Sequence, residues 1–123
     1  AVVSFQNGVV AADQIAQAYG RERTLGGVAN IGAVIEKPGV IRHTGTMAGL
    51  TFGELDGKIS PRVQALAEAC TRAGIQHKAS DDITKAIWEK YVFLVAASAM
   101  TSLTRPSIWR PFTSTTATSP PSL

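Results

Sequence analysis

Lys90 is a candidate for proton transfer. It lies in the stretch Ser80–Arg105, which we interpret as one long helix. No carboxylate stands three or four residues away from it, where its helical neighbours are Ala86, Ile87, Phe93 and Leu94. A lysine among apolar side chains has two interpretations. Its stem extends until the ammonium reaches water, or its amine is partly desolvated and has a lowered pKa suited to proton transfer.

Asn7 is a second candidate, in the sequence Gln6-Asn7-Gly8. The apolar segment Ala1–Phe5 before it predicts the end of a buried strand, and Val9–Tyr19 after it predicts a helix. Such a unit places the loop at the carboxyl end of a strand, where open α/β sheets bind ligands. The Asn7 amide either contacts a ligand there, as donor and acceptor, or simply closes a turn.

Other residues with reactive side chains are interpreted as structural. We expect His43 to be hydrogen-bonded or at a sheet edge, and because no second ligand has suitable spacing we predict no metal site. The single Cys70 falls on the apolar face of a predicted helix, which is typical of a reducing compartment. The glycine-rich segment Thr24–Ile35 lacks both phosphate-binding spacings, so we predict a strand that another backbone approaches closely.

Further elements must position these residues. After the glycine-rich strand, short strands are predicted at Val40–His43 and Leu50–Leu55, with a loop around Gly45–Gly49. Ser60 and Pro61 start a helix, which residue 74, a glycine, ends.

The residues that follow predict a crossover and then the long helix. Ile75–Ala79 is interpreted as the crossover. Ser80 is the predicted N-cap, and Asp81 and Asp82 lie in the first turn, where the helix dipole favours negative charge.

Composition limits the class of protein. With 123 residues, 45% of them hydrophobic, the chain can build one modest core or parts of two domains. Its net charge of +3, from 12 basic and 9 acidic residues, is too small and too scattered for a nucleic-acid partner. Glu89 and Lys90 interrupt the one long apolar run, so we predict no membrane span. No signal-peptide pattern opens the chain, and we expect a cytoplasmic location for a longer protein of which Ala1 is an internal residue.

The pattern changes after Arg105. Residues 106–123 are rich in Ser, Thr and Pro and have no helical period, so we predict an irregular, mobile tail. The tail is either a natural linker or the product of an altered reading of the coding sequence.

Taken in order, the motifs resemble the ketopantoate reductase (2-dehydropantoate 2-reductase) family over residues 1 to about 105. They are Gln6-Asn7-Gly8, the glycine-rich strand, Pro38–Gly45, Phe52-Gly53-Glu54, Asp82-Ile83, Trp88-Glu89-Lys90 and Thr101–Arg105. Each is weak alone, and the ordered set carries the resemblance, above all W-x-K ahead of an apolar helix.

The resemblance implies a two-domain α/β oxidoreductase. The C-terminal edge of a Rossmann-type nucleotide-binding sheet would occupy residues 1–57, a partial all-helical substrate domain 58–105, and the irregular tail 106–123. The implied reaction reduces ketopantoate to pantoate with NADPH, on the route to pantothenate. A homodimer is compatible with the resemblance. The family's phosphate-binding glycines are absent, so we expect the chain alone to be inactive.

The resemblance also implies roles for single residues. Lys90 resembles the lysine that donates a proton to the substrate carbonyl. Asn7 resembles the loop asparagine that touches cofactor and substrate, and Ala33 a backbone contact to the cofactor just after the glycine-rich strand. Ser98 stands where many members bind substrate through an asparagine, and its hydroxyl could still form a hydrogen bond.

Two alternatives stay open. Leu94 also stands where many members carry a substrate-binding asparagine, which leaves open a related two-domain dehydrogenase acting on another 2-keto or 3-hydroxy acid. The other alternative is a non-catalytic helical fragment, in which Lys90 is a surface lysine.

Leu94→Asn separates the first alternative from ketopantoate reduction. Leu94 lies one helical turn after Lys90, so both side chains share a face. If the natural substrate is more apolar than ketopantoate, the asparagine should improve turnover of ketopantoate because it adds one hydrogen bond to this substrate. The expected gain in transition-state stabilisation is about 1–3 kcal/mol. The measurement is kcat/KM for ketopantoate in a full-length enzyme. Efficient turnover that the substitution leaves unchanged would mean that Leu94 carries no information about substrate.

Overall fold

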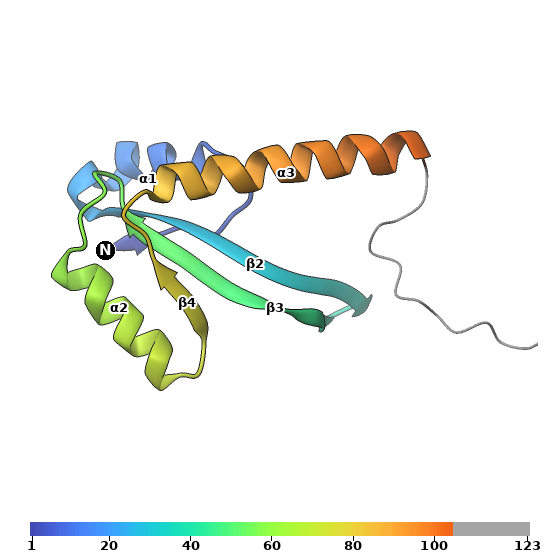
Figure 1. The fold of residues 1–123 in the computed structure, drawn as a ribbon, viewed down its shortest axis with the longest axis horizontal. Coiled ribbons are helices and arrows are strands. Elements are labelled where there is room, and N and C mark those ends of the chain that lie inside the picture. Colours follow the sequence, from blue (N-terminus) through green and yellow to red (C-terminus); the bar gives the residue numbers. More distant parts are fainter. Residues whose placement is uncertain (105–123) are drawn as a thin grey trace, which may run out of the picture. The chain divides into compact units, whose positions relative to one another are not determined.

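A computed structural model describes residues 1–104 of the chain (Figure 1). The elements in order are β1 (Val2–Val3), α1 (Ala11–Tyr19), a short 3₁₀ helix η1 (Arg21–Arg23), β2 (Thr24–Lys37), β3 (Val40–Glu54), α2 (Pro61–Arg72), β4 (Gln76–Ala79) and α3 (Ile83–Thr104). The described residues divide into two units, residues 1–92 and 93–104, and α3 contributes to both. The tail predicted at 106–123 lies outside the described residues. Of the helices in residues 1–104, none is long and apolar enough to cross a membrane.

The first unit is built on one mixed sheet with the strand order β1-β2-β3-β4. Strand β1 pairs parallel with β2, β2 antiparallel with β3, and β3 parallel with β4. On one face Leu25 and Phe52 pack with Val63 and Cys70 of α2, and all four are buried. The beginning of α3 lies on the other side of the strands (Figure 1). This arrangement confirms the predicted fold class, a Rossmann-like α/β sheet followed by a helix.

Several predicted helix ends are confirmed. The Ser60 hydroxyl accepts a hydrogen bond from the Val63 N–H at 3.3 Å, and Pro61 is the first residue of α2. Gly74 adopts φ +67° just after α2, a conformation that favours glycine. Gly20 does the same after α1, at φ +91°.

The predicted loop at Gly45–Gly49 is wrong, because β3 is one strand of 15 residues. Gly45 adopts φ +74° within it, and the pairing with β2 shifts register between Ile31 and Ala33. Between the pairs made by Ile31 and Ala33, residues 44–47 of β3 stand opposite residue 32 of β2 alone, so Gly45 marks an irregularity of several residues within one strand. Residues 76–79, expected to be only a crossover, form β4 and pair with residues 49–52 of β3.

The predicted start of the long helix is also wrong, by two residues. Helix α3 begins at Ile83, and Asp82 caps it by accepting the Lys85 N–H at 3.0 Å. The Ser80 hydroxyl accepts from the Asp82 N–H at 3.1 Å, two residues too early to cap the helix. The Ser80 N–H donates to the Phe52 carbonyl at 2.9 Å and so continues the pairing of the β4 end with β3. The domain division predicted at residues 57 and 58 stays a prediction, and β4 and α2 pack into the same unit as residues 1–57.

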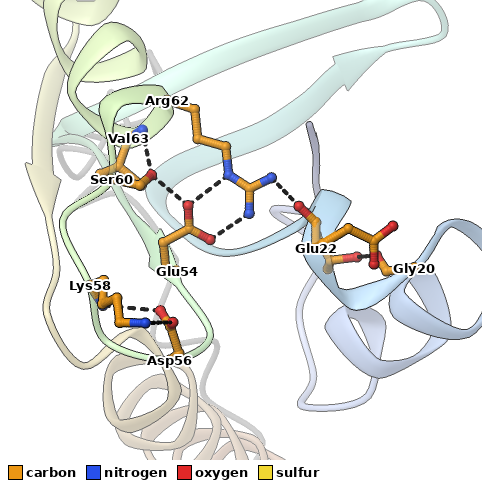
Figure 2. Close-up of polar contacts among 9 residues, drawn as sticks. Gly20, Glu22, Glu54, Asp56, Lys58, Ser60, Arg62 and Val63 are labelled. Atoms are coloured by element: carbon orange, nitrogen blue, oxygen red, sulfur yellow. Dashed lines mark hydrogen bonds and ion pairs between the residues drawn. The ribbon is translucent and has the colours of Figure 1, made fainter.

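An ion pair holds the end of β3 to the start of α2 (Figure 2). The Glu54 carboxylate, 11% exposed, accepts hydrogen bonds from Arg62 Nε at 2.6 Å and Nη2 at 2.5 Å and from the Ser60 hydroxyl at 2.5 Å. Arg62 also donates to the backbone carbonyl of Glu22. These hydrogen bonds, with those from Arg62 as the largest cause, hold the pKa of Glu54 below its usual value.

Arg62→Ala should lower the free energy of unfolding by about 2–4 kcal/mol, because it leaves a buried carboxylate without its bidentate partner. Urea unfolding at neutral pH measures the loss. Arg72→Ala is the matched control: its pair with Glu68 is 3.9 Å long and highly exposed, so the expected change is within about 0.5 kcal/mol.

The stability that Arg62→Ala loses at neutral pH should become smaller in acid. The pKa of Glu54 is lower in the folded than in the unfolded chain, so its stabilisation is complete above the ordinary carboxyl value of about 4.3. That stabilisation is lost as the pH falls through the folded-state pKa. The gap in stability between the wild type and Arg62→Ala should therefore narrow in acid, and a gap that stays constant would contradict the role given to the pair.

Candidate functional site

One face of α3 runs along strand β2 and carries the candidate lysine. Ile83, Ile87 and Lys90 follow one another at helical spacing and lie on the same face. Ile83 is 1% exposed and lies above Gly26 of β2. Lys90, two turns later, reaches Ala29 of the same strand.

The Lys90 ammonium is bound to the protein backbone. Its Nζ donates a hydrogen bond to the carbonyl oxygen of Ala29, and the side chain is half-buried. Glu89, the neighbouring carboxylate, pairs instead with Lys85 at 3.9 Å. No ion pair involves Lys90 within residues 1–104, and desolvation by burial lowers its pKa below the usual lysine value. The structure thus favours the partly desolvated amine over a lysine extended into water.

The loop after β1 lies beside this face of α3. Ile87, one turn before Lys90, lines a small hollow together with Gly27 of β2. The other lining residues come from the loop and from the start of α1: Ser4, Gln6, Gly8, Val9, Ala11 and Ala12. The hollow has a volume of about 10 Å³, room for about one water molecule. The carboxyl end of β1, the glycine-rich strand and α3 therefore meet at one place.

Asn7 lies in this loop and is exposed. The next residue, Gly8, adopts φ +105°, and a Cβ built there would meet no atom within 4 Å. The loop thus leaves an amide and an open stretch of backbone beside the β1 end, which fits a bound group approaching the main chain closely.

Ala33, another predicted site residue, is not part of this cluster. Ala33 lies four residues beyond Ala29 along β2, roughly 13 Å at strand rise, and it is paired with His43 of β3. It lies within the strand and not after it. Ser98 belongs to the second unit, where its backbone carbonyl accepts the hydroxyls of Thr101 and Ser102. The roles of Asn7, Ala33, Lys90 and Ser98 stay predictions.

His43 is hydrogen-bonded as expected, with Nε2 2.9 Å from the Met47 carbonyl. Cys70 is a free, buried thiol of the core beneath the sheet. Within residues 1–104 no group of three or more His, Cys, Asp and Glu side chains is placed to hold a metal ion.

Sequence reasoning missed the backbone partner of Lys90. Every residue has a backbone carbonyl oxygen, so the type of residue at position 29 did not indicate this partner. The glycine-rich segment did predict that another backbone approaches closely, and at Gly27 that group is the Ser4 carbonyl. At Gly26 the approaching group is instead the side chain of Ile83 in α3, which was not predicted.

Comparisons with known proteins agree with this arrangement. Residues 1–57 match the family model described as "Ketopantoate reductase PanE/ApbA". A 2-dehydropantoate 2-reductase of Archaeoglobus fulgidus is 36% identical over 105 residues, 85% of this chain and 34% of that protein. An uncharacterized oxidoreductase of Bacillus subtilis, YkpB, is 33% identical over 102 residues, 83% of this chain and 34% of that protein.

The crystal structure of a 2-dehydropantoate 2-reductase from Geobacter metallireducens has the same fold. It superposes with a TM-score of 0.74 at 29% identity, over 84% of this chain and 34% of that one. The chain thus spans about a third of the length of the relatives that it matches.

The pKa of Lys90 can be measured directly. In a chain labelled with ¹³C,¹⁵N-lysine, its Cε and Nζ signals, assigned with Lys90→Arg, should titrate below the ordinary lysine value of about 10.4 because the ammonium is partly desolvated. A midpoint at or above that value would contradict the view that burial lowers the pKa of this amine.

Proposed function

Because the chain belongs to the ketopantoate reductase family, we propose that it forms part of an NADPH-dependent oxidoreductase that reduces ketopantoate to pantoate, a step toward pantothenate. The observation that supports this most is the position of Lys90. Its half-buried ammonium lies one turn beyond the hollow shared by α3 and the loop after β1.

The loop fits a nicotinamide cofactor. Ligands of open α/β sheets bind at the carboxyl ends of strands, and Gln6-Asn7-Gly8 presents an exposed amide and open backbone there. We propose that Asn7 holds both cofactor and substrate, and that Ala33 adds a backbone contact to the cofactor. When bound, the cofactor supplies the hydride.

Lys90 is proposed as the general acid. Negative charge develops on the oxygen of a ketone that gains hydride, and an ammonium beside that oxygen stabilises the charge and then donates its proton. The neutral amine regains a proton from water. Partial burial favours this role because it lowers the pKa of the amine toward the working pH.

A second candidate function follows from Leu94. A leucine offers no hydrogen bond to a substrate hydroxyl or carboxylate, whereas an asparagine does. A related dehydrogenase acting on a more apolar 2-keto acid therefore stands as the alternative. Ser98 is proposed to bind substrate in either case.

A chimera tests the proposal. It carries residues 1–104 in place of the matching segment of the A. fulgidus reductase, to which the chain is 36% identical. We expect it to reduce ketopantoate with NADPH. In the chimera Lys90→Ala should lower kcat by roughly 10²–10⁴-fold, the usual range for a lost general acid, and should change KM less.

Lys85→Ala is the matched control, since Lys85 is on the same helix but exposed and paired with Glu89. It should change kcat by less than about threefold, as expected for a surface charge. If Lys90→Ala in a folded chimera has an effect as small as that of Lys85→Ala, Lys90 is a surface lysine and the proposal fails.

A further inference from the structure

We infer that Gly26 is a positioning residue: its missing side chain sets the register of helix α3 on strand β2 and so places the Lys90 ammonium at the Ala29 carbonyl. This inference rests on the proposed function only for its catalytic meaning. The geometry stands on contacts among residues 26–90.

Gly26 leaves no room for a side chain. A Cβ built on it would lie 2.8 Å from Cγ1 and 2.9 Å from Cγ2 of Ile83, and 3.3 Å from Cδ1 of Ile87. Gly53 stands directly across from Gly26 on β3, and a Cβ there would first meet the Ser80 carbonyl oxygen and would lie 3.3 Å from Cβ of Ile83. Directly opposed residues of an antiparallel pair point to the same face. The two glycines thus form a seat without side chains, in which Ile83 is 1% exposed.

The spacing of residues along the helix and the strand explains how packing at Gly26 and Gly53 determines the position of Lys90. From Ile83 to Lys90 the helix advances about 10.5 Å at 1.5 Å per residue. From Gly26 to Ala29 the strand advances about 10 Å. With Ile83 fixed above Gly26, the helix therefore delivers Lys90 level with Ala29, where its Nζ donates to the carbonyl.

Among residues 1–104, no carboxylate forms an ion pair with Lys90. Glu89 on the same helix pairs with Lys85, and burial is the one cause that lowers the Lys90 pKa. On β2, the flanking residues Val28 and Asn30 are uncharged. The location of the amine thus depends on how closely the helix approaches the strand.

Gly26→Ala tests this in the full chain labelled with ¹³C,¹⁵N-lysine. The methyl group should push Ile83 and the helix away from β2, so that Lys90 leaves the Ala29 carbonyl and regains water. The NMR titration midpoint of Lys90 should then rise toward the ordinary lysine value. Gly49→Ala is the control: the nearest atom to its Cβ is the Gln76 carbonyl at 3.9 Å, an ordinary contact, and the midpoint should not change.

The double variant Gly26→Ala/Ile83→Ala distinguishes a shift of α3 along β2 from loss of folding. Circular dichroism checks that each variant is folded. Removing the Ile83 Cγ atoms restores room for the new methyl group, so the midpoint should return toward the wild-type value. A folded Gly26→Ala chain with an unchanged midpoint would overturn the inference. If Gly26→Ala does not fold, the folded double variant decides: a lowered midpoint supports the inference, and an ordinary one overturns it.

The titration needs neither cofactor nor substrate, so its failure is distinct from that of the proposed function. A raised midpoint in Gly26→Ala, together with full activity of Lys90→Ala, would leave the positioning intact and remove the catalytic role. An unchanged midpoint in Gly26→Ala, together with loss of activity in Lys90→Ala, would keep the catalytic role of Lys90 and remove the positioning role of Gly26.

Discussion

The close approach of α3 to β2 is the constraint on which the candidate site depends. Ile83 packs onto a cross-strand pair of glycines, Gly26 and Gly53, and is almost fully buried there. Any side chain at either glycine would meet atoms at less than ordinary contact distance. Because a helix is rigid over two turns, one contact near its start fixes where its later residues lie along the strand. The lysine is thus located by packing, and its hydrogen bond to the Ala29 carbonyl follows.

Two groups of contacts near the start of β2 have different roles. The Glu54–Arg62 pair joins the end of β3 to α2 and reaches the Glu22 carbonyl (Figure 2). Beside Gly27 of β2, the loop after β1 and Ile87 of α3 come together. The charged pair is fully hydrogen-bonded and stabilises the fold. Within residues 1–104 the Lys90 ammonium is bound to the Ala29 carbonyl and to no carboxylate, which fits the proposed role in proton transfer.

Much of this was predictable from local patterns. The α2 cap at Ser60, the glycine that follows α2, and the strand–loop–helix around Asn7 each depend on residues close in sequence. Strand β4 was missed because four residues are too few for a period. The helix start was misplaced because both Ser80 and Asp82 are residue types that cap helices, and Ser80 instead continues the pairing of the β4 end with Phe52 of β3. Ala29 was unpredictable, since its contribution is a backbone atom.

The central claim is that Lys90 is placed to protonate a carbonyl oxygen beside the loop after β1. The most direct measurement is a crystal structure of a full-length protein carrying this segment, with NADP⁺ and a 2-keto acid bound. We expect the Lys90 Nζ within about 2.6–3.2 Å of the keto oxygen, the reach of a hydrogen bond. A keto acid bound with its carbonyl turned away from Lys90, with Nζ still on the Ala29 carbonyl, would contradict the claim.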